Sequence, residues 1–211
     1  MVLSHTHRFI FWKPHKVGST SVMVALGSVC GVQDSVGGVA DSDDPALTGL
    51  RRNMTAFCHL PTGGNHAAPV DLKMITDALW GEGLWQHYVK VTIVRNPWAR
   101  AVSWWDYATH RLEQDLPFDQ ALTNTERPYW FDDQGKALAQ VYLRCENLKQ
   151  DYLKFCGDYD IPTTALPRLR RGQRTPDKPY WEYYNDETRQ LIADNFRLEI
   201  DHFGYRFGDP A

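Results

Sequence analysis

Short apolar runs alternate along this chain with segments whose apolar residues recur at helical spacing. The clearest run, YVKVTIVRNP at residues 88–97, is rich in β-branched residues and precedes a helix-like stretch over residues 98–112. Similar strand-then-helix patterns occupy residues 7–31 and 140–159, and Ser19 or Thr20 is expected to cap the helix of the first pattern. Because strands that alternate with helices build βαβ units, the pattern predicts an α/β fold. We expect three layers, with a mostly parallel sheet flanked by helices.

Three further segments complete this prediction. MTAFCHLP at residues 54–61 is typical of a second strand, and DLKMITDALWG at residues 71–81 has helical period. Residues 186–204 form an amphipathic pattern that predicts one helix, with Asp186 as its cap. Residues 31–53 are rich in Gly, Asp and Ser, which favours a surface loop or flap.

Composition narrows the class of protein. A chain of 211 residues with 43% hydrophobic content predicts one domain, residues 1–211, with a sizeable core. A formal net charge of −3 argues against a nucleic-acid partner, because such proteins usually carry a basic surplus. The four cysteines show neither C-x-x-C pairing nor zinc-like spacing, which favours reduced thiols over a disulfide framework.

No stretch suggests a membrane or a secretory route. The chain begins without a long apolar signal-peptide region, and no run approaches the ~20 apolar residues that span a bilayer. We therefore expect a cytoplasmic protein with no membrane partner. The sequence does not predict an oligomeric state.

The loop KPHKVGSTSV, at residues 13–22, has the character of an anion-binding loop but not the Walker order. In G-x-x-x-x-G-K-[ST] the lysine follows the second glycine, whereas here Lys16 precedes Gly18. A strand, a tight turn and a helix together point backbone N–H groups at one anion, and Ser19, Thr20 and Ser21 add hydroxyl donors. An ordinary helix start with a solvated lysine remains the alternative at this point.

A second pair of residues follows the strand at 88–97. Arg95 lies at the predicted carboxyl end of that strand, where ligands bind in open α/β sheets. Ser103 lies about two turns into the following helix, and Asn96-Pro97 sets the turn between them. An arginine and a serine so placed can clamp a phosphate. The alternative is that Arg95 pairs with an acidic neighbour and that Ser103 is a buried small residue.

Together, KVGSTS at residues 16–21 and RNPWARAVS at residues 95–103 resemble the sulfotransferases that use 3′-phosphoadenosine-5′-phosphosulfate (PAPS). The similarity is greatest to the group that contains the Golgi carbohydrate 2-O-sulfotransferases, and it touches most of the chain. The resemblance implies a P-loop-like sulfotransferase fold and PAPS as co-substrate, with no metal. One departure is His15, where those enzymes have proline.

The resemblance also implies a set of cofactor-binding residues. In that family the first loop binds the 5′-phosphosulfate, and the Arg…Ser pair binds the 3′-phosphate. A basic loop near the C-terminus often closes over the cofactor; here that segment is RLRRGQRTPDK at residues 168–178. Carried over to this chain, the set comprises Lys16, Val17, Gly18, Ser19, Thr20, Ser21, Arg95, Ser103, Arg171 and Gly172.

Two residues are predicted to be catalytic. By the resemblance, Lys16 neutralises the leaving phosphate. His59 is the candidate base for the acceptor hydroxyl, because it ends the predicted strand at 54–61 and imidazole accepts protons near neutral pH. A histidine follows the second strand in the carbohydrate enzymes as well. The reserve candidates are His110, Glu82 and His66.

These features predict transfer of a sulfuryl group from PAPS to the hydroxyl of a carbohydrate or another small-molecule alcohol, giving PAP. One alternative is a P-loop kinase for a small molecule, which the missing G-K-[ST] order disfavours. The other is a non-catalytic nucleotide-binding relative. Sequence does not distinguish a sugar from another alcohol as the acceptor.

Overall fold

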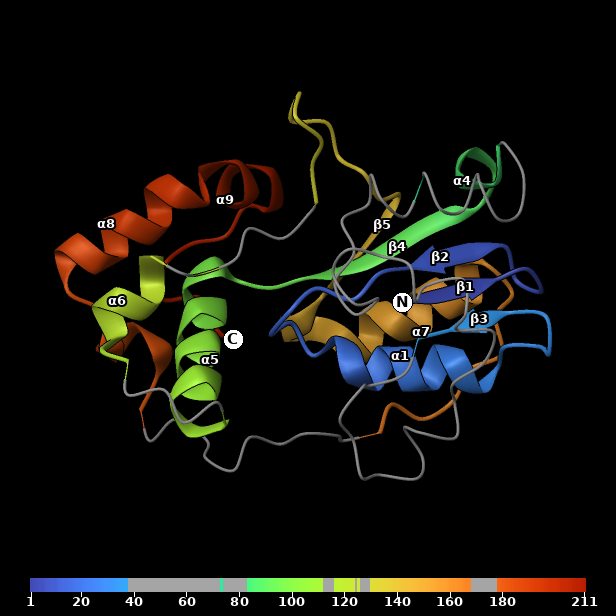
Figure 1. The fold of residues 1–211 in the computed structure, drawn as a ribbon, viewed down its shortest axis with the longest axis horizontal. Coiled ribbons are helices and arrows are strands. Elements are labelled where there is room, and N and C mark those ends of the chain that lie inside the picture. Colours follow the sequence, from blue (N-terminus) through green and yellow to red (C-terminus); the bar gives the residue numbers. More distant parts are fainter. Residues whose placement is uncertain (38–72, 74–82, 112–115, 124, 126–129, 168–177) are drawn as a thin grey trace. The chain divides into compact units, whose positions relative to one another are not determined.

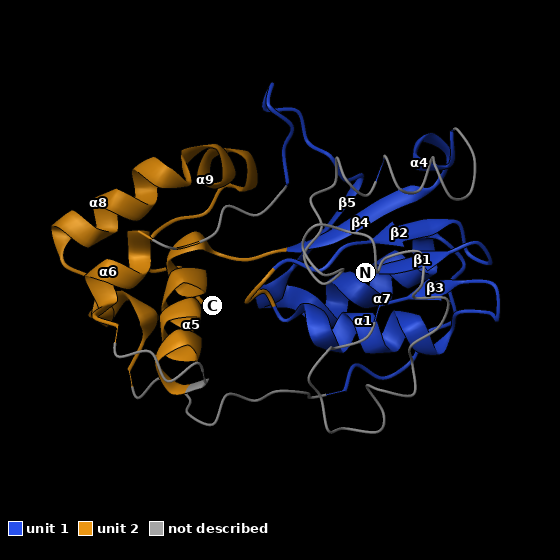
Figure 2. Cartoon of the chain, in the orientation of Figure 1, with its two compact units in different colours: residues 1–14, 18–93, 129–169 blue, residues 15–17, 94–128, 170–211 orange. Residues whose placement is uncertain are grey.

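The computed structural model describes residues 1–37, 73, 83–111, 116–123, 125, 130–167 and 178–211. The chain divides into two compact units (Figure 2). Unit 1 contains residues 1–14, 18–93 and 129–169, and unit 2 contains residues 15–17, 94–128 and 170–211. Each unit is described by itself below. The single domain expected from the sequence stays a prediction.

Unit 1 is built on a five-stranded sheet of order β3-β1-β2-β4-β5 (Figure 1). Strand β1 pairs antiparallel with both β2 and β3, and β2 pairs parallel with β4. The α/β class is therefore confirmed, but the sheet is mixed, so the expectation of a mostly parallel sheet is corrected. The strands are β1 (Val2–Ser4), β2 (Phe9–Phe11), β3 (Ser35–Val36), β4 (Val89–Val94) and β5 (Val141–Arg144).

The mixed sheet has a local cause. Strand β1 is only three residues long, too short to show a period, and it turns back at once to pair Leu3 with Ile10 of β2. The edge strand β3 lies within the segment expected to be a loop. Antiparallel neighbours need only such short connections, whereas parallel neighbours need a crossover.

Both faces of the sheet carry packed side chains. Phe9 packs edge-on against Phe155 of α7 (Leu148–Asp158), with the ring centroids 6.1 Å apart. Side chains alternate along a strand, so Ile10 points to the opposite face. There a cluster that includes Ile10 and Trp12 packs against α4 (Leu84–His87). Trp12 stacks on Trp85 of α4 at 6.4 Å between ring centroids.

Unit 2 is helical. Its elements are α5 (Pro97–Arg111), α6 (Phe118–Thr123), the 3-10 helix η3 (Tyr180–Tyr183), α8 (Asp186–Asn195) and α9 (Arg197–Phe203). The single helix expected over residues 186–204 is thus two helices that break at Phe196. The cap is Asn185 rather than Asp186, because Asn185 and Thr188 form a reciprocal capping box.

A buried ion pair joins α5 to α9 within unit 2. Arg100 Nη2 donates to Glu199 Oε2 at 3.2 Å, and both side chains are almost wholly buried. The Arg100 guanidinium also lies 4.7 Å from the centre of the Phe196 ring, at the break between α8 and α9. Burial lowers the pKa of Arg100, and Glu199 opposes that shift. The pair therefore fixes the base of α5 against the C-terminal helices.

Two predicted elements cannot be compared with the structure. The strand expected at residues 54–61 lies outside the described residues, as does the helix expected at 71–81 apart from Lys73. Among the helices that the structure describes, none is long and apolar enough to cross a membrane.

Asp34 organises the end of the sheet where β1 turns into β2. Its buried carboxylate accepts hydrogen bonds from Ser4 Oγ (2.9 Å) and from the backbone N–H groups of His5 (2.7 Å), Thr6 (3.1 Å) and Gly31 (2.8 Å). Burial alone would raise the pKa of Asp34, but these hydrogen bonds together lower it below the usual value. Asp34 thus joins two turns that are distant in sequence.

We expect Asp34→Asn to lower the free energy of unfolding by about 1.5–3 kcal/mol at pH 7, the usual worth of hydrogen bonds to a charged group. Because the pKa is lowered in the folded state, this stability is present above the unfolded value of ~3.9. It is lost as the pH falls through the folded-state pKa. Urea unfolding of both proteins between pH 7 and pH 2 measures the effect. Asp133→Asn, at an exposed position, is the matched control. A deficit in Asp34→Asn that does not shrink in acid would contradict the assignment.

Candidate functional site

The predicted anion-binding loop connects β2 to α1 (Ser19–Ser28). Helix α1 begins after Gly18, whose left-handed backbone (φ 77°, ψ 12°) serves as the N-cap without a side-chain hydrogen bond. The expectation that Ser19 or Thr20 caps this helix is therefore wrong. The first turn of α1 carries no acidic residue, so the helix itself places no carboxylate against an anion at these N–H groups.

The loop hydroxyls of unit 1 have different environments. Ser19 is buried, and its Oγ donates to the Pro14 carbonyl at 2.9 Å, which closes the loop at its start. Thr20 and Ser21 are half-buried at the beginning of α1. The Ser19 hydroxyl therefore donates its proton within the loop and not to a ligand. Its backbone N–H remains at the start of the helix.

Glycine is favoured at position 18 by the backbone conformation and less by a lack of room for a side chain. A Cβ built there would lie 3.4 Å from Leu148 Cδ2 and 3.6 Å from Cys145 Sγ, which are near-ordinary contacts. The φ angle of 77° lies in the left-handed region, where a side chain costs about 1–2 kcal/mol. Gly18 itself is exposed.

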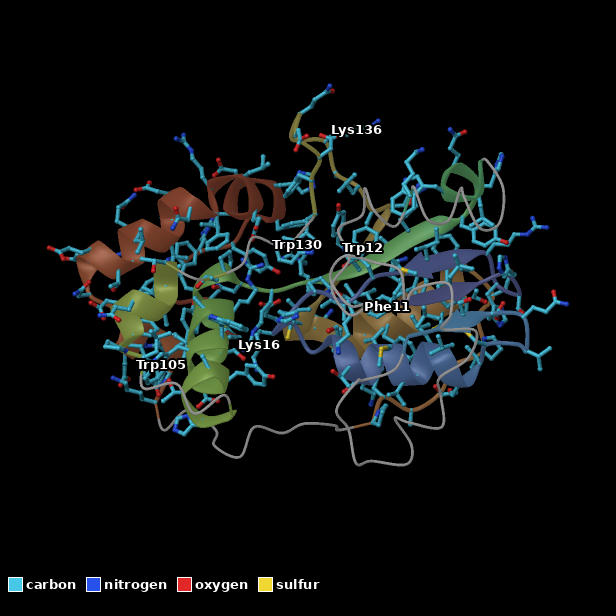
Figure 3. All side chains as sticks on the ribbon, in the orientation of Figure 1. Phe11, Trp12, Lys16, Trp105, Trp130 and Lys136 are labelled. Atoms are coloured by element: carbon cyan, nitrogen blue, oxygen red, sulfur yellow. The ribbon has the colours of Figure 1, made fainter. Side chains whose placement is uncertain are left out.

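The part of the loop that belongs to unit 2 is held by Arg95, which directly follows β4. Arg95 Nη1 donates to the carbonyl oxygen of Lys16 at 2.9 Å. Lys16 has a left-handed backbone (φ 58°), which is uncommon for a residue other than glycine. Its Nζ lies 4.5 Å from the centre of the Tyr107 ring on α5. The Lys16 side chain is labelled in Figure 3. Val17, the next residue, is fully buried.

Ser103 shares a helix face with the aromatic partner of Lys16. It is half-buried on α5, four residues before Tyr107, and residues at that spacing lie one above the other on a helix. Within unit 2 the structure therefore brings Lys16, Arg95 and Tyr107 into contact and places Ser103 on the adjoining turn. Tyr107 was missed in the sequence, although its spacing from Ser103 could have indicated it.

Asn96 was read from the sequence only as a turn former, and the structure gives it a larger role. It is fully buried; its Oδ1 accepts from the N–H groups of Trp98 (3.1 Å) and Ala99 (3.3 Å). Its Nδ2 donates to Tyr180 Oη at 3.3 Å and to the Arg206 carbonyl at 3.0 Å. Asn96 therefore caps α5 and fixes the backbone beside Arg95.

His15, the departure from the family pattern, lies against α5. Its ring centroid is 6.0 Å from that of Trp104, and the side chain is half-buried. The Trp104 ring is in turn 5.9 Å from Tyr107, so His15 and Lys16 border the same aromatic pair.

Several predicted residues lie outside the part of the chain that the structure describes: His59, His66, Glu82, Arg171 and Gly172. Of the candidate bases only His110 is described. It is exposed near the end of α5, with Nδ1 at 2.9 Å from the Asp106 carbonyl oxygen and 3.3 Å from its carboxylate. The structure thus leaves the assignment of the base to His59 as a prediction.

The described tryptophans differ in exposure, and Trp104 and Trp105 on α5 are half-buried. Trp130 is fully buried and Trp98 nearly so, while Trp181 on η3 is 39% exposed. Within the described ranges, no cluster of three or more His, Cys, Asp or Glu side chains could hold a metal ion. The chain matches no protein-family model, no curated protein and no solved structure with which it was compared.

The left-handed turn predicts a clear difference between two glycine substitutions. Gly18→Ala should lower the free energy of unfolding by about 1–2 kcal/mol, because the left-handed backbone conformation is unfavourable for alanine. Gly157→Ala, in α7 with nothing within 4 Å of the new Cβ, should raise it by about 0.5–1 kcal/mol. Urea unfolding of the two variants beside wild type tests this. Equal stability of Gly18→Ala and wild type would show that the turn needs no glycine.

Proposed function

We propose that this chain is a PAPS-dependent sulfotransferase of the cytoplasm that transfers a sulfuryl group to the hydroxyl of a carbohydrate or another small-molecule alcohol. The observation that carries the proposal is the pairing of Arg95 with the loop lysine. Two basic residues from separate motifs, Lys16 and Arg95, are joined by a 2.9 Å hydrogen bond. A lysine before the glycine and an arginine at a strand end suit a ligand with two separate phosphate groups.

The 3′-phosphate is assigned to Arg95 and Ser103. The Nε of Arg95 is buried and has no hydrogen-bond partner among the described residues. A buried donor without a partner costs about 1–3 kcal/mol, which a bound anion would recover. Ser103, half-buried on α5, offers a hydroxyl to the same group.

The 5′-phosphosulfate is assigned to the loop from Lys16 to Ser21. The backbone N–H groups at the start of α1 point along the helix axis, and their partial positive charge favours an anion. Lys16 supplies a full positive charge. Its amine lies over the Tyr107 ring, a contact worth about 0.5–2 kcal/mol that an anion can replace.

The proposed chemistry is direct transfer. The acceptor oxygen forms a bond to sulfur while the bond between sulfur and the 5′-phosphate oxygen breaks, leaving its electron pair on the phosphate. His59 takes the proton of the acceptor hydroxyl. Lys16 stabilises the charge that builds on the leaving phosphate, an interaction strongest in the transition state. Arg171 and Gly172 are proposed to contact PAPS from the basic segment.

Nucleotide binding tests the proposal against its rivals. Thermal unfolding should shift with PAP and only slightly with ATP or ATP–magnesium. The stabilisation should be about 2.7 kcal/mol when PAP is 100-fold above its Kd. A shift with ATP–magnesium and none with PAP would favour the kinase. PAP binding without sulfate transfer to any sugar, phenol, peptide or lipid alcohol would favour a non-catalytic relative.

Ser103→Ala is a clean test of the 3′-phosphate assignment. Alanine is the better helix former, so α5 should keep its stability while the hydroxyl donor is lost. Losing a hydrogen bond to a charged group costs about 1.5–3 kcal/mol, so the Kd for PAP should rise roughly 10- to 100-fold. The Kd for adenosine 5′-phosphosulfate, which lacks the 3′-phosphate, should stay unchanged. Calorimetry with both nucleotides measures this, and equal weakening of the two would refute the assignment.

A further inference from the structure

The guanidinium nitrogens of Arg95 can serve two roles: one can bind the protein backbone and another can bind an anion. Nη1 is committed to the protein, because it donates to the Lys16 carbonyl oxygen at 2.9 Å. Nε is buried and has no partner among the residues that the structure describes. A guanidinium is a rigid planar fork, so the direction of Nη1 also fixes the direction of Nε. One side chain can thus hold the loop and an anion together.

The carbonyl that Arg95 holds belongs to a residue in a costly conformation. Lys16 has φ 58°, and a left-handed backbone costs a residue with a side chain about 1–2 kcal/mol. Such a residue persists only where its surroundings determine it. Within unit 2, Lys16 accepts the Arg95 hydrogen bond at its carbonyl oxygen, and its amine lies over the Tyr107 ring.

The backbone that carries Arg95 is held in place by its neighbour Asn96. The neighbouring Asn96 side chain is fully buried and binds the start of α5, Tyr180 Oη and the Arg206 carbonyl. The guanidinium therefore projects from a backbone that the neighbouring residue anchors by several hydrogen bonds. Because Arg95 is anchored and the left-handed backbone of Lys16 is unfavourable, the hydrogen bond between them stabilises the conformation of Lys16.

We propose that Arg95 is a positioning residue for Lys16: Nη1 holds the left-handed turn that directs the lysine amine, while Nε binds the distal anion. Arg95 is thereby more than a 3′-phosphate ligand. Occupying the arginine at one end of the cofactor stiffens the turn that carries the lysine at the other end. The catalytic part of this inference rests on the proposed function; the structural part does not.

Hydrogen exchange of the ligand-free protein tests the structural part. Arg95→Met keeps an unbranched side chain of similar length and removes every donor, and Arg95→Lys keeps one donor and the charge. Backbone amides of residues 15–20 should exchange about tenfold faster in Arg95→Met, and at an intermediate rate in Arg95→Lys. The exchange of residues 149–158 of α7 should not change.

Arg189→Met, which removes an exposed arginine over the Phe207 ring, is the matched control and should leave the exchange of residues 15–20 unchanged. Unchanged exchange of residues 15–20 in both Arg95 variants would overturn the inference.

Kinetics tests the catalytic part. At saturating PAPS, Arg95→Met should lose about tenfold or more in kcat, because a misplaced lysine no longer meets the developing charge. Arg189→Met, at an exposed position outside the proposed site, should keep the wild-type kcat and KM. Arg95→Met should also weaken adenosine 5′-phosphosulfate, which Ser103→Ala does not. Faster loop exchange with wild-type kcat would overturn the catalytic role. If wild type transfers no sulfate, the proposed function fails, and hydrogen exchange still decides whether Arg95 holds the turn.

Discussion

The turn between β2 and α1 is the constraint on which the candidate site depends. The chain leaves a buried strand, places Lys16 and Gly18 in the left-handed region, and begins a helix directly afterwards. Glycine adopts that conformation at no steric cost, whereas lysine needs an external support. Arg95, which is far from Lys16 in the sequence, supplies such support through its hydrogen bond to the Lys16 carbonyl oxygen. The most polar segment of the loop thus depends on a residue from another motif.

Buried polar side chains in this protein differ in how fully their hydrogen bonds are satisfied. Asp34 accepts hydrogen bonds from four described groups, and Asn96 accepts at its amide oxygen and donates from its amide nitrogen. Both are satisfied within the fold, which is the normal state of a buried polar group. Arg95 keeps a buried donor that the described residues do not satisfy. The side chains of Trp12, Ser35, Trp104 and Thr109 also keep buried polar atoms without a partner among the described residues. For Arg95, a bound anion is the partner that the proposed function supplies.

Much of the local structure could be predicted because it depends on neighbours in the sequence. The strand at β4 and the helices α5 and α7 follow from β-branched runs and helical spacing. The predicted cap of α1 was wrong because the hydroxyl of Ser19 reaches back to Pro14, which leaves Gly18 as the cap. The helix expected over residues 186–204 breaks at Phe196, where the Arg100 guanidinium lies over the ring. In both cases a competing contact outweighs the propensity on which the prediction depended.

Local sequence patterns were enough to identify the residues that could form a phosphate-binding loop: Lys16, Gly18 and the hydroxyls that follow, with Arg95 after a strand. This was possible because loop chemistry and strand ends are local patterns. Only the tertiary structure decided that the sheet is mixed, that Arg95 holds the Lys16 carbonyl, and that Tyr107 lies beneath the lysine amine. These facts depend on contacts between residues distant in the chain, and local patterns carry no information about which distant groups will meet.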